Sequence, residues 1–403
     1  MLTGRDIIYI SSIEWDFLWQ PHQEIARRLG RAGNRILYIE NTGVRAPGLG
    51  DAARVIARLK SWMSSLNSRG VREVAPGVYV CSPLVLPPFG SDVRKLINRY
   101  LLLPLIRGVA RKLEMRDVLI WSYLPTDTVL DLIRLLRTEK SATIYYCMAD
   151  FSQLTPDSAQ IAKSERLLVR QSDLVFANCT KISKRLLEWA DRVDIFPPGV
   201  NLDAFALVNS MDTANGREPG ENLTTPERPT IGYIGGLHRH VDFDLVAQMA
   251  DARPEWSWVM VGPLQASAER LDGRKNIRLE GPKPHEELGS YLKRFDVCIV
   301  PYLQSAYTET VVPVKINEYL AAGKPVVSTN LPTVVEFNER HRILITAKNN
   351  RDDFLNGIEA ALRLPHDPGT IARRREVAAL CDWNLQLEAM SNLIQKKLEQ
   401  KRR

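Results

Sequence analysis

Short runs of β-branched and aromatic residues alternate with longer helical patterns along most of this 403-residue chain. This alternation is typical of parallel sheets wrapped by helices. Two series of candidate strands are present, at 7–10, 36–39, 78–81, 118–121, 143–146, 174–177 and 193–196, and at 230–234, 258–261, 277–279, 297–300, 326–328 and 343–345. We therefore expect an α/β protein of two Rossmann-like, doubly wound domains that face a central cleft, with ligands at the carboxyl ends of the strands.

A polar segment separates the two series. Residues 209–229 (NSMDTANGREPGENLTTPERP) are rich in turn formers and nearly devoid of large apolar residues, which is typical of a loop or linker. With 45% hydrophobic residues, the chain has enough apolar material for two cores. We predict an N-terminal domain at 1–200, a C-terminal domain at 201–383 with a polar loop or linker at 206–229, and a final helix at 384–403.

Residues 312–329 (VPVKINEYLAAGKPVVST) combine a short helix, a glycine turn and a buried strand. Pro313 suits the first helical position, and Gly323 suits the end of the helix. Lys315 and Glu318 lie three residues apart and so share one helical face. A carboxylate there can accept both hydroxyls of a ribose, and an ammonium one turn away can meet a diphosphate. The alternative is that the two side chains only pair with each other on a surface helix.

Gly235 and Gly236 directly follow a candidate strand and precede a helix that we expect to start near Asp242. Glycine allows close approach, so the backbone N–H groups of such a turn can bind phosphate. The alternative is an ordinary strand-to-helix turn that binds nothing. The acids of Asp242-Phe243-Asp244 are interpreted as first-turn partners of the helix dipole rather than as a metal site. No divalent metal is expected.

Several of these segments resemble the GT-B glycosyltransferases, particularly the GT4 group (glycosyltransferase group 1). The matching strings are EYLAAGKPVV at 318–327, IGYIGGLHRHVDFDLV at 231–246, WSWVMVGP at 256–263, FDVCIVPY at 295–302 and FPPGVNLDAF at 196–205, the last resembling a domain junction. The resemblance implies a nucleoside diphosphate sugar as donor substrate, and it implies that the final helix returns to the first domain. The implied donor-binding residues are Gly235, Gly236, Arg239, Pro301, Tyr302, Val314, Lys315 and Glu318.

The phosphate-binding positions depart from the common GT4 pattern. That pattern has an Arg after the second-domain strand and a Lys at the start of the next helix, where this chain has Gly236 and Val241. Arg239 and Lys315 are candidates to replace the missing charges. Looser binding of the diphosphate is the alternative.

The acids that would set the stereochemistry leave two mechanisms open. Many retaining GT4 enzymes carry two glutamates at a spacing that would place the first at Thr310, whereas the acid here is Glu309. The segment IYYCMADFSQL (144–154), taken with Lys315, also resembles the inverting xanthan-type glucuronosyltransferases. That resemblance implies that Asp150 is the general base. Asp150 could instead cap a turn or helix.

Candidate acceptor-binding residues occur in the first domain. The loop at 11–20 (SSIEWDFLWQ) and the end of a later strand bring together aromatic faces and polar groups, a common way to bind sugar rings: Glu14, Trp15, Trp19 and Gln20, and Trp121 and Tyr123. The tryptophans of the loop lie four residues apart, so one or both could instead anchor the next helix to the core.

The positive charge suggests a membrane surface rather than nucleic acid. The net charge is +7, and in 94–116 (RKLINRYLLLPLIRGVARKLEMR) Arg94 and six further Arg or Lys residues are interleaved with apolar ones. Such a segment can lie on an anionic membrane, or it can be a buried helix whose cations reach solvent. Stacked aromatics and nucleic-acid motifs are lacking.

The five widely spaced cysteines, Cys81, Cys147, Cys179, Cys298 and Cys381, indicate a reduced, cytosolic protein. The sequence shows no signal peptide and no apolar run long enough to span a bilayer. We therefore expect a cytoplasmic, metal-independent glycosyltransferase, with a candidate surface for the inner face of the cell membrane. Its expected acceptor is a lipid-linked glycan, in the biosynthesis of a cell-surface polysaccharide or glycolipid. The alternative is a catalytically silent member of the fold that binds a nucleotide sugar or acts as a scaffold.

Overall fold

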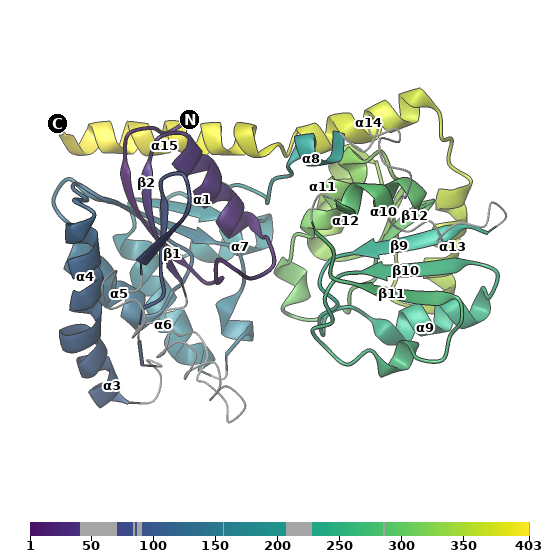
Figure 1. The fold of residues 1–403 in the computed structure, drawn as a ribbon, viewed down its shortest axis with the longest axis horizontal. Coiled ribbons are helices and arrows are strands. Elements are labelled where there is room, and N and C mark those ends of the chain that lie inside the picture. Colours follow the sequence, from purple (N-terminus) through teal and green to yellow (C-terminus); the bar gives the residue numbers. More distant parts are fainter. Residues whose placement is uncertain are drawn as a thin grey trace. The chain divides into compact units, whose positions relative to one another are not determined.

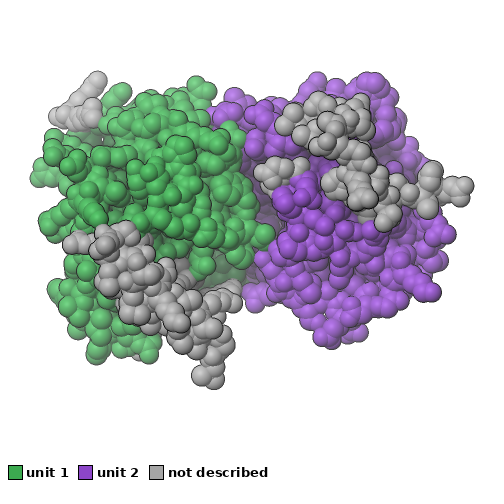
Figure 2. Space-filling model, in the orientation of Figure 1, with its two compact units in different colours: residues 1–197, 386–403 green, residues 198–385 purple. Residues whose placement is uncertain are grey.

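A computed structural model describes residues 1–40, 71–83, 85–86, 91–155, 157–206, 228–284 and 287–402. The chain forms two compact units, one of Met1–Pro197 with Gln386–Arg403 and the other of Pro198–Leu385 (Figure 2). The change of unit after Pro197 lies close to the predicted boundary at residue 200. Most of the predicted polar linker lies outside the described residues.

Unit 1 is built on an eight-stranded sheet in the order β3-β4-β2-β1-β5-β6-β7-β8. Its strands are β1 Asp6–Ser11, β2 Arg35–Glu40, β3 Val71–Ala75, β4 Val78–Cys81, β5 Leu119–Ser122, β6 Ala142–Cys147, β7 Leu174–Ala177 and β8 Asp194–Ile195. All neighbours pair in parallel except β3, which pairs antiparallel with β4. The sequence did not predict β3, because its residues (VREVA) are partly exposed and polar at an edge of the sheet.

Helices cover the sheet of unit 1 (Figure 1). They are α1 Pro21–Arg31, α3 Asp92–Ile97, the π-helical turn η2 Asn98–Leu102, α4 Leu103–Lys112, α5 Asp127–Leu136, the short 3₁₀ turn η3 Phe151–Gln153, α6 Ser158–Gln171 and α7 Thr180–Leu186. Because helices shield both sides of a parallel sheet, its central strands read as continuous apolar runs; every residue of β6 is buried.

Unit 2 is built on a six-stranded, all-parallel sheet in the order β11-β10-β9-β12-β13-β14. Its strands are β9 Thr230–Ile234, β10 Ser257–Val261, β11 Ile277–Gly281, β12 Val297–Val300, β13 Val326–Thr329 and β14 Ile345–Ala347. Its helices are α8 Leu202–Ala206, α9 Phe243–Ala252, η5 Glu269–Leu271, α10 Leu288–Arg294, η7 Thr308–Thr310, α11 Val314–Ala321, α12 Pro332–His341, α13 Arg351–Leu362 and α14 Pro368–Ala379.

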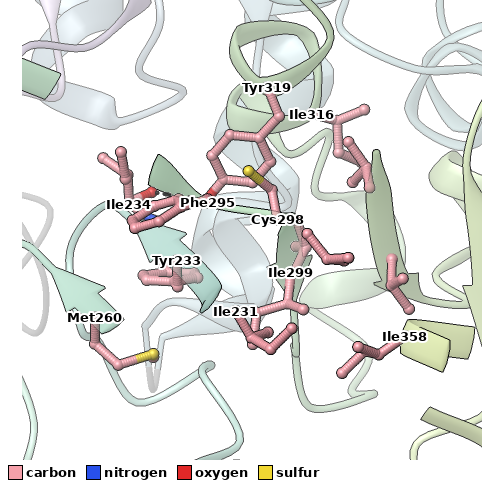
Figure 3. Packing of buried hydrophobic residues seen from close by; sticks show 14 of the residues in the cluster. Ile231, Tyr233, Ile234, Met260, Phe295, Cys298, Ile299, Ile316, Tyr319 and Ile358 are labelled. Atoms are coloured by element: carbon pink, nitrogen blue, oxygen red, sulfur yellow. Dashed lines mark hydrogen bonds between the residues drawn. The ribbon is translucent and has the colours of Figure 1, made fainter. Parts of the chain in front are cut away.

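The core of unit 2 is packed between β9, β12 and the helices that cover them (Figure 3). A Cβ atom on Gly232 would lie only 2.0 Å from the ring of Phe295, so this buried strand position accepts no side chain. Tyr319 of α11 is fully buried and reaches the carboxyl end of β9, where its hydroxyl accepts a hydrogen bond from Ile234 N at 2.8 Å (Figure 3). The sheet and α11 are therefore locked together near the predicted phosphate-binding turn.

The last helix, α15 Trp383–Arg402, begins in unit 2 and belongs to unit 1 from Gln386 onward. Within unit 1, Ser391 Oγ accepts a hydrogen bond from Leu2 N at 2.9 Å. Lys401 Nζ lies 2.8 Å from the Asp173 carboxylate and donates to Ser141 O at 2.8 Å. These contacts fix the chain's C-terminal helix to the domain in which the chain starts.

Both series of predicted strands are present, which confirms the expected α/β class with two Rossmann-like units. All five cysteines are buried thiols. Among the described residues, no helix combines the length and apolar character that a bilayer crossing requires.

Candidate functional site

Two buried tyrosines hold the start of the loop that follows β9 through hydrogen bonds to its backbone. Tyr233 donates a hydrogen bond from its hydroxyl to Gly236 O at 2.9 Å. Tyr319 binds the backbone of Ile234 one residue before the glycine pair. The backbone of the predicted phosphate-binding turn is thus fixed by side chains of the core.

Glycines at the ends of β9 and β10 let two loops approach closely. Gly235 has φ +141° and Gly262 has φ +146°, conformations that side-chain-bearing residues rarely adopt. A Cβ on Gly262 would lie 2.0 Å from Gly235 O. Gly235 N also donates to Val261 O at 2.8 Å. The sequence analysis singled out the first glycine pair but missed Gly262, whose role depends on a contact between neighbouring strands.

Lys315 lies directly over this glycine turn. A Cβ on Gly235 would lie 2.9 Å from Lys315 Cε and 3.2 Å from its Nζ. The ammonium donates to the Tyr302 hydroxyl at 2.6 Å and stands 5.2 Å from the ring centre of Tyr233 and 5.1 Å from that of Tyr302. Cation–π attraction therefore keeps the charge beside the turn. The structure brings together the predicted residues Gly235, Tyr302 and Lys315.

Two histidines lie in the loop after the glycine turn, and His238 is near the Lys315 ammonium. The ring of His238 lies 5.3 Å from that of Tyr302. Burial, then the Lys315 charge, lower the pKa of His238 to about 4, so the imidazole is neutral near pH 7. Arg239 is exposed, and its Nε lies 3.4 Å from His240 Nε2. The positive charge beside the glycine turn comes from Lys315 of α11 and from Arg239 of the loop, not from the histidines.

The loop is also paired with the end of β12. Asp242 N donates to Pro301 O at 2.8 Å, and Leu303 N donates to His240 O at 2.9 Å. The Asp242 side chain caps α9 by accepting from Leu245 N at 2.8 Å and also accepts from Asn349 Nδ2 at 2.9 Å. As expected, this acid stabilises a helix start. No group of three His, Cys, Asp or Glu residues suited to a metal ion occurs within the described ranges.

A hollow of about 320 Å³ lies beside this loop, lined in part by Asp242, Leu303, Asn349 and Arg351. Its lining does not include Lys315 or Glu318. We therefore base the candidate donor site on the convergence of the glycine turn, the tyrosines and Lys315, and not on this hollow.

The remaining predicted donor residues lie on two neighbouring elements. Pro313 is the N-cap of α11 rather than its first helical residue, and Val314 begins the helix. Glu318 lies one turn after Lys315 and is partly buried. Glu309 is the central, partly buried residue of the turn η7. Its role in holding a donor sugar stays a prediction.

Asp150 caps the turn η3 in unit 1, as the alternative interpretation expected. Its Oδ1 accepts hydrogen bonds from Ser152 N at 3.1 Å and Ser152 Oγ at 2.6 Å. Arg185, which sequence reasoning missed, also lies here. Its Nη1 is 4.0 Å from the same oxygen of Asp150. These hydrogen bonds use only one carboxylate oxygen of Asp150 and leave the other outside them. The assignment of Asp150 as the general base stays a prediction.

A buried network holds Arg185 in this position. Glu165 is 1% exposed, and its Oε2 lies 2.5 Å from Arg185 Nη1, while Tyr145 donates its hydroxyl hydrogen to Oε1 at 2.6 Å. Burial alone lowers the pKa of Arg185, but the Glu165 charge outweighs it and the net shift is upward. Glu165 and Arg185 lie 15 and 35 residues after Asp150 and carry no motif, so only the packing of α6 on β6 and of α7 on β7 reveals them.

The expected acceptor set divides into buried and exposed residues. Trp121 and Tyr123 have no exposed surface, and Trp15 is only 8% exposed. This corrects the expectation that they line a binding surface: they are core residues, packed around Tyr9 and Tyr38. Parallel strands of a covered sheet bury both faces, and the aromatic residues at their ends fill that core.

The other three predicted residues of the loop are at least partly accessible. Glu14 is exposed, Trp19 is 44% exposed, and Gln20 is the N-cap of α1. Trp19 donates from Nε1 to Glu24 Oε2 at 2.9 Å and lies under the guanidinium of Arg27. Glu14, Trp19 and Gln20 therefore stay candidates for acceptor binding.

Comparison with known proteins agrees with this geometry. Residues 228–363 match the family described as Glycosyl transferases group 1. The chain is 29% identical over 233 residues to the Bacillus subtilis protein named "Putative teichuronic acid biosynthesis glycosyltransferase TuaH", covering 56% of this chain and 57% of that one. It is 28% identical over 214 residues to a D-inositol 3-phosphate glycosyltransferase of Corynebacterium jeikeium, covering 47% and 49%. The chain spans about half the length of these curated relatives.

Solved structures match over nearly the whole chain. Sucrose-phosphate synthase from Thermosynechococcus elongatus has a TM-score of 0.68 at 16% identity, covering 98% of this chain and 99% of that one. HepE from Anabaena, in complex with UDP and glucose, has a TM-score of 0.66 at 14% identity, covering 97% and 100%. At these identities the likeness establishes the fold.

Proposed function

We propose that this chain, a GT-B protein whose second unit carries a group 1 glycosyltransferase segment, transfers a sugar from a nucleoside diphosphate sugar to a glycan. The observation that carries the proposal is the placement of Lys315 over the glycine turn at the carboxyl end of β9. Ligands of doubly wound sheets bind at this edge. The match to HepE, a protein solved with UDP and glucose, supports the donor class.

Two parts of the donor, the diphosphate and the ribose, have proposed partners of complementary chemistry. The Lys315 ammonium and the backbone N–H groups of the glycine turn would offset the diphosphate charge, including the charge that grows on it as the sugar leaves. The Glu318 carboxylate, one turn along α11, would accept the two ribose hydroxyls. In this proposal no divalent metal is required, because protein cations and backbone dipoles supply the positive field.

The acceptor side is assigned to unit 1, with Glu14, Trp19 and Gln20 as its accessible polar and aromatic groups. In an inverting reaction, Asp150 takes the proton of the acceptor hydroxyl while the hydroxyl oxygen bonds to the anomeric carbon of the donor sugar. The bond from that carbon to the diphosphate breaks, and the nucleoside diphosphate leaves with the electron pair. In a retaining reaction, Glu309 contacts the donor sugar and Asp150 binds acceptor.

The proposed acceptor is a lipid-linked glycan of cell-surface polysaccharide or glycolipid synthesis, extended at the cytosolic side of the membrane. The match to a protein named for teichuronic acid biosynthesis favours this class. A GT4-like assignment is proposed from the order of the sequence motifs.

Calorimetric titration of the full chain with UDP, GDP, TDP and ADP sugars, without added metal, tests the donor site. One nucleotide is expected to bind at micromolar Kd and to lose at least about tenfold affinity in Glu318→Ala, since both ribose contacts disappear. The matched control is Glu339→Ala, an exposed acid on α12 of the same unit. Absence of binding by every nucleotide, or equal binding by both variants, would remove the donor-site assignment.

A silent, scaffold-like role is the second candidate, and the departure at Gly236 and Val241 from the Arg and Lys of the GT4 pattern favours it. Release of free nucleoside diphosphate from the bound sugar nucleotide, measured with an extract of lipid-linked glycans, separates the two. Donor binding together with acceptor-dependent release supports transfer. Donor binding without release supports the scaffold.

A further inference from the structure

Large apolar side chains gather on one exposed face of unit 1. Val93, Leu96, Tyr100, Leu101 and Leu105 are 64%, 52%, 66%, 64% and 45% exposed. We call these five residues the α3–α4 face. Elsewhere in the described ranges, exposed large apolar residues are single or paired along the sequence. A contiguous exposed apolar surface of this kind marks an interaction site.

The helical geometry explains why these side chains point outward. Leu103, Ile106 and Val109 are buried and attach α4 to unit 1, where it packs against α5 (Figure 1). Asn98 is also buried, and its side chain bonds the backbone N–H and C=O of Leu86 at 2.9 and 2.8 Å. With one side of the helix used for packing, its second apolar stripe is left facing solvent.

The π-helical turn η2 carries two residues of this second stripe. Tyr100 and Leu101, adjacent in sequence within the turn, are both exposed. From sequence, residues 94–116 are compatible with a membrane-facing segment or with a buried helix with projecting cations. The exposures show that the segment has both a buried face and an exposed apolar face.

Basic side chains occur on the same helical segment as the α3–α4 face. Residues 92–112 contain six Lys or Arg residues and one acid, Asp92. Lys95 and Arg99 lie 3.2 and 3.8 Å from Asp127 and Asp131 of α5. Three other exposed cations, Arg94, Arg107 and Arg111, have no carboxylate within 4.0 Å among the described residues. Unpaired cations around an apolar stripe are complementary to an anionic, partly apolar surface.

We propose that the α3–α4 face docks on an anionic lipid bilayer. The five apolar side chains enter the boundary between headgroups and acyl chains, and the cations that border them contact lipid phosphates. The helix lies in the plane of the interface. This inference concerns unit 1 alone and does not depend on the proposed sugar transfer.

Flotation of the full chain with vesicles tests the proposal. The vesicles contain phosphatidylcholine with or without phosphatidylglycerol and no glycan acceptor, so binding through an acceptor site is not measured. The apolar variant is Leu96→Gln/Leu101→Gln/Leu105→Gln. Its control is Leu167→Gln/Leu187→Gln/Leu264→Gln, three other leucines that are 43%, 46% and 56% exposed.

The charge variant is Arg94→Gln/Arg107→Gln/Arg111→Gln, and its control is Arg166→Gln/Arg170→Gln/Arg340→Gln, which lowers the net charge equally at other exposed positions. Thermal melting checks that every variant is folded. We expect the wild type to float only with anionic vesicles, with binding weakened by added salt. Both α3–α4 variants should bind at least about tenfold more weakly, and both controls should bind like the wild type.

Three results would overturn the proposal. The first is a wild-type protein that does not float with anionic vesicles. The second is a pair of α3–α4 variants that float as well as their controls. The third is a dimer, detected by light scattering, that dissociates in the apolar variant, because the face would then be covered by a second copy of the chain.

Discussion

At the scale of single residues, His22 makes unit 1 sensitive to acid. It is 6% exposed, its ring centre lies 4.1 Å from that of Tyr123, and burial lowers its pKa to about 3. In the unfolded chain the same group takes up a proton near pH 6.5. Unfolding therefore becomes more favourable as the pH falls from about 6.5 toward about 3.

We predict that this effect removes about 2 kcal/mol from the free energy of unfolding between pH 7 and pH 5. His22→Gln, which cannot take up the proton, should unfold with a flatter dependence on pH. Urea unfolding at pH 7, 6 and 5 measures the difference. His366→Gln replaces an exposed histidine and should keep the wild-type slope. A His22→Gln slope equal to that of the wild type would contradict the assignment.

Some of the residues predicted to form sites lie together in the structure, and others are buried in the core. Lys315 and Gly235 were singled out from their types and spacing, and the structure brings them together. Trp121 and Tyr123 were singled out for the same reason, as aromatic residues after a strand, but they lie in the core. Spacing places a residue at a strand end without deciding whether its side chain turns inward or outward.

At the scale of elements, the candidate donor site depends on two strand-end loops in contact. Gly235 and Gly262 touch through backbone atoms, since Gly235 N binds Val261 O and a Cβ on Gly262 would overlap Gly235 O. The pairing of β9 with β10 sets this approach. A side chain at Gly262 must push the loops apart.

Gly262→Ala is therefore expected to lower the free energy of unfolding of unit 2 by about 2 kcal/mol or more and to abolish nucleotide binding. Gly273→Ala is the matched control: its φ is also positive, at +77°, but a Cβ there meets nothing within 4 Å. In the control, backbone strain alone should lower the free energy of unfolding by about 1 kcal/mol and leave nucleotide binding intact. Thermal melting and calorimetric titration measure both properties. Equal losses in the two variants would show that the loop contact is unimportant.

At the scale of the whole molecule, the chain's last helix completes its first unit. Leu387, Met390 and Ile394 of α15 are at most 1% exposed. Leu385, two residues before Leu387 on the same helix, is 54% exposed. A helix distant in sequence therefore contributes part of the core of unit 1.

Leu387→Ala should destabilise unit 1 by about 2–5 kcal/mol, because it leaves a cavity in packed apolar surroundings. Leu385→Ala should change stability by less than about 0.5 kcal/mol, since its side chain already contacts water. Calorimetric melting, with near-ultraviolet circular dichroism to follow the tyrosine-rich core of unit 1, measures the two variants. A Leu385→Ala effect as large as that of Leu387→Ala would contradict this role of α15.

The sequence by itself determined the two series of strands, the α/β class and the identity of the glycine turn and Lys315, because periodicity and turn chemistry are local properties of the chain. Only the tertiary structure decided which aromatic residues are buried and that Gly262 touches Gly235. It also decided that Arg185 lies near Asp150 and forms an ion pair with the buried Glu165. Each of these depends on the pairing of strands and the packing of helices that lie far apart in sequence, and local patterns carry no record of such contacts.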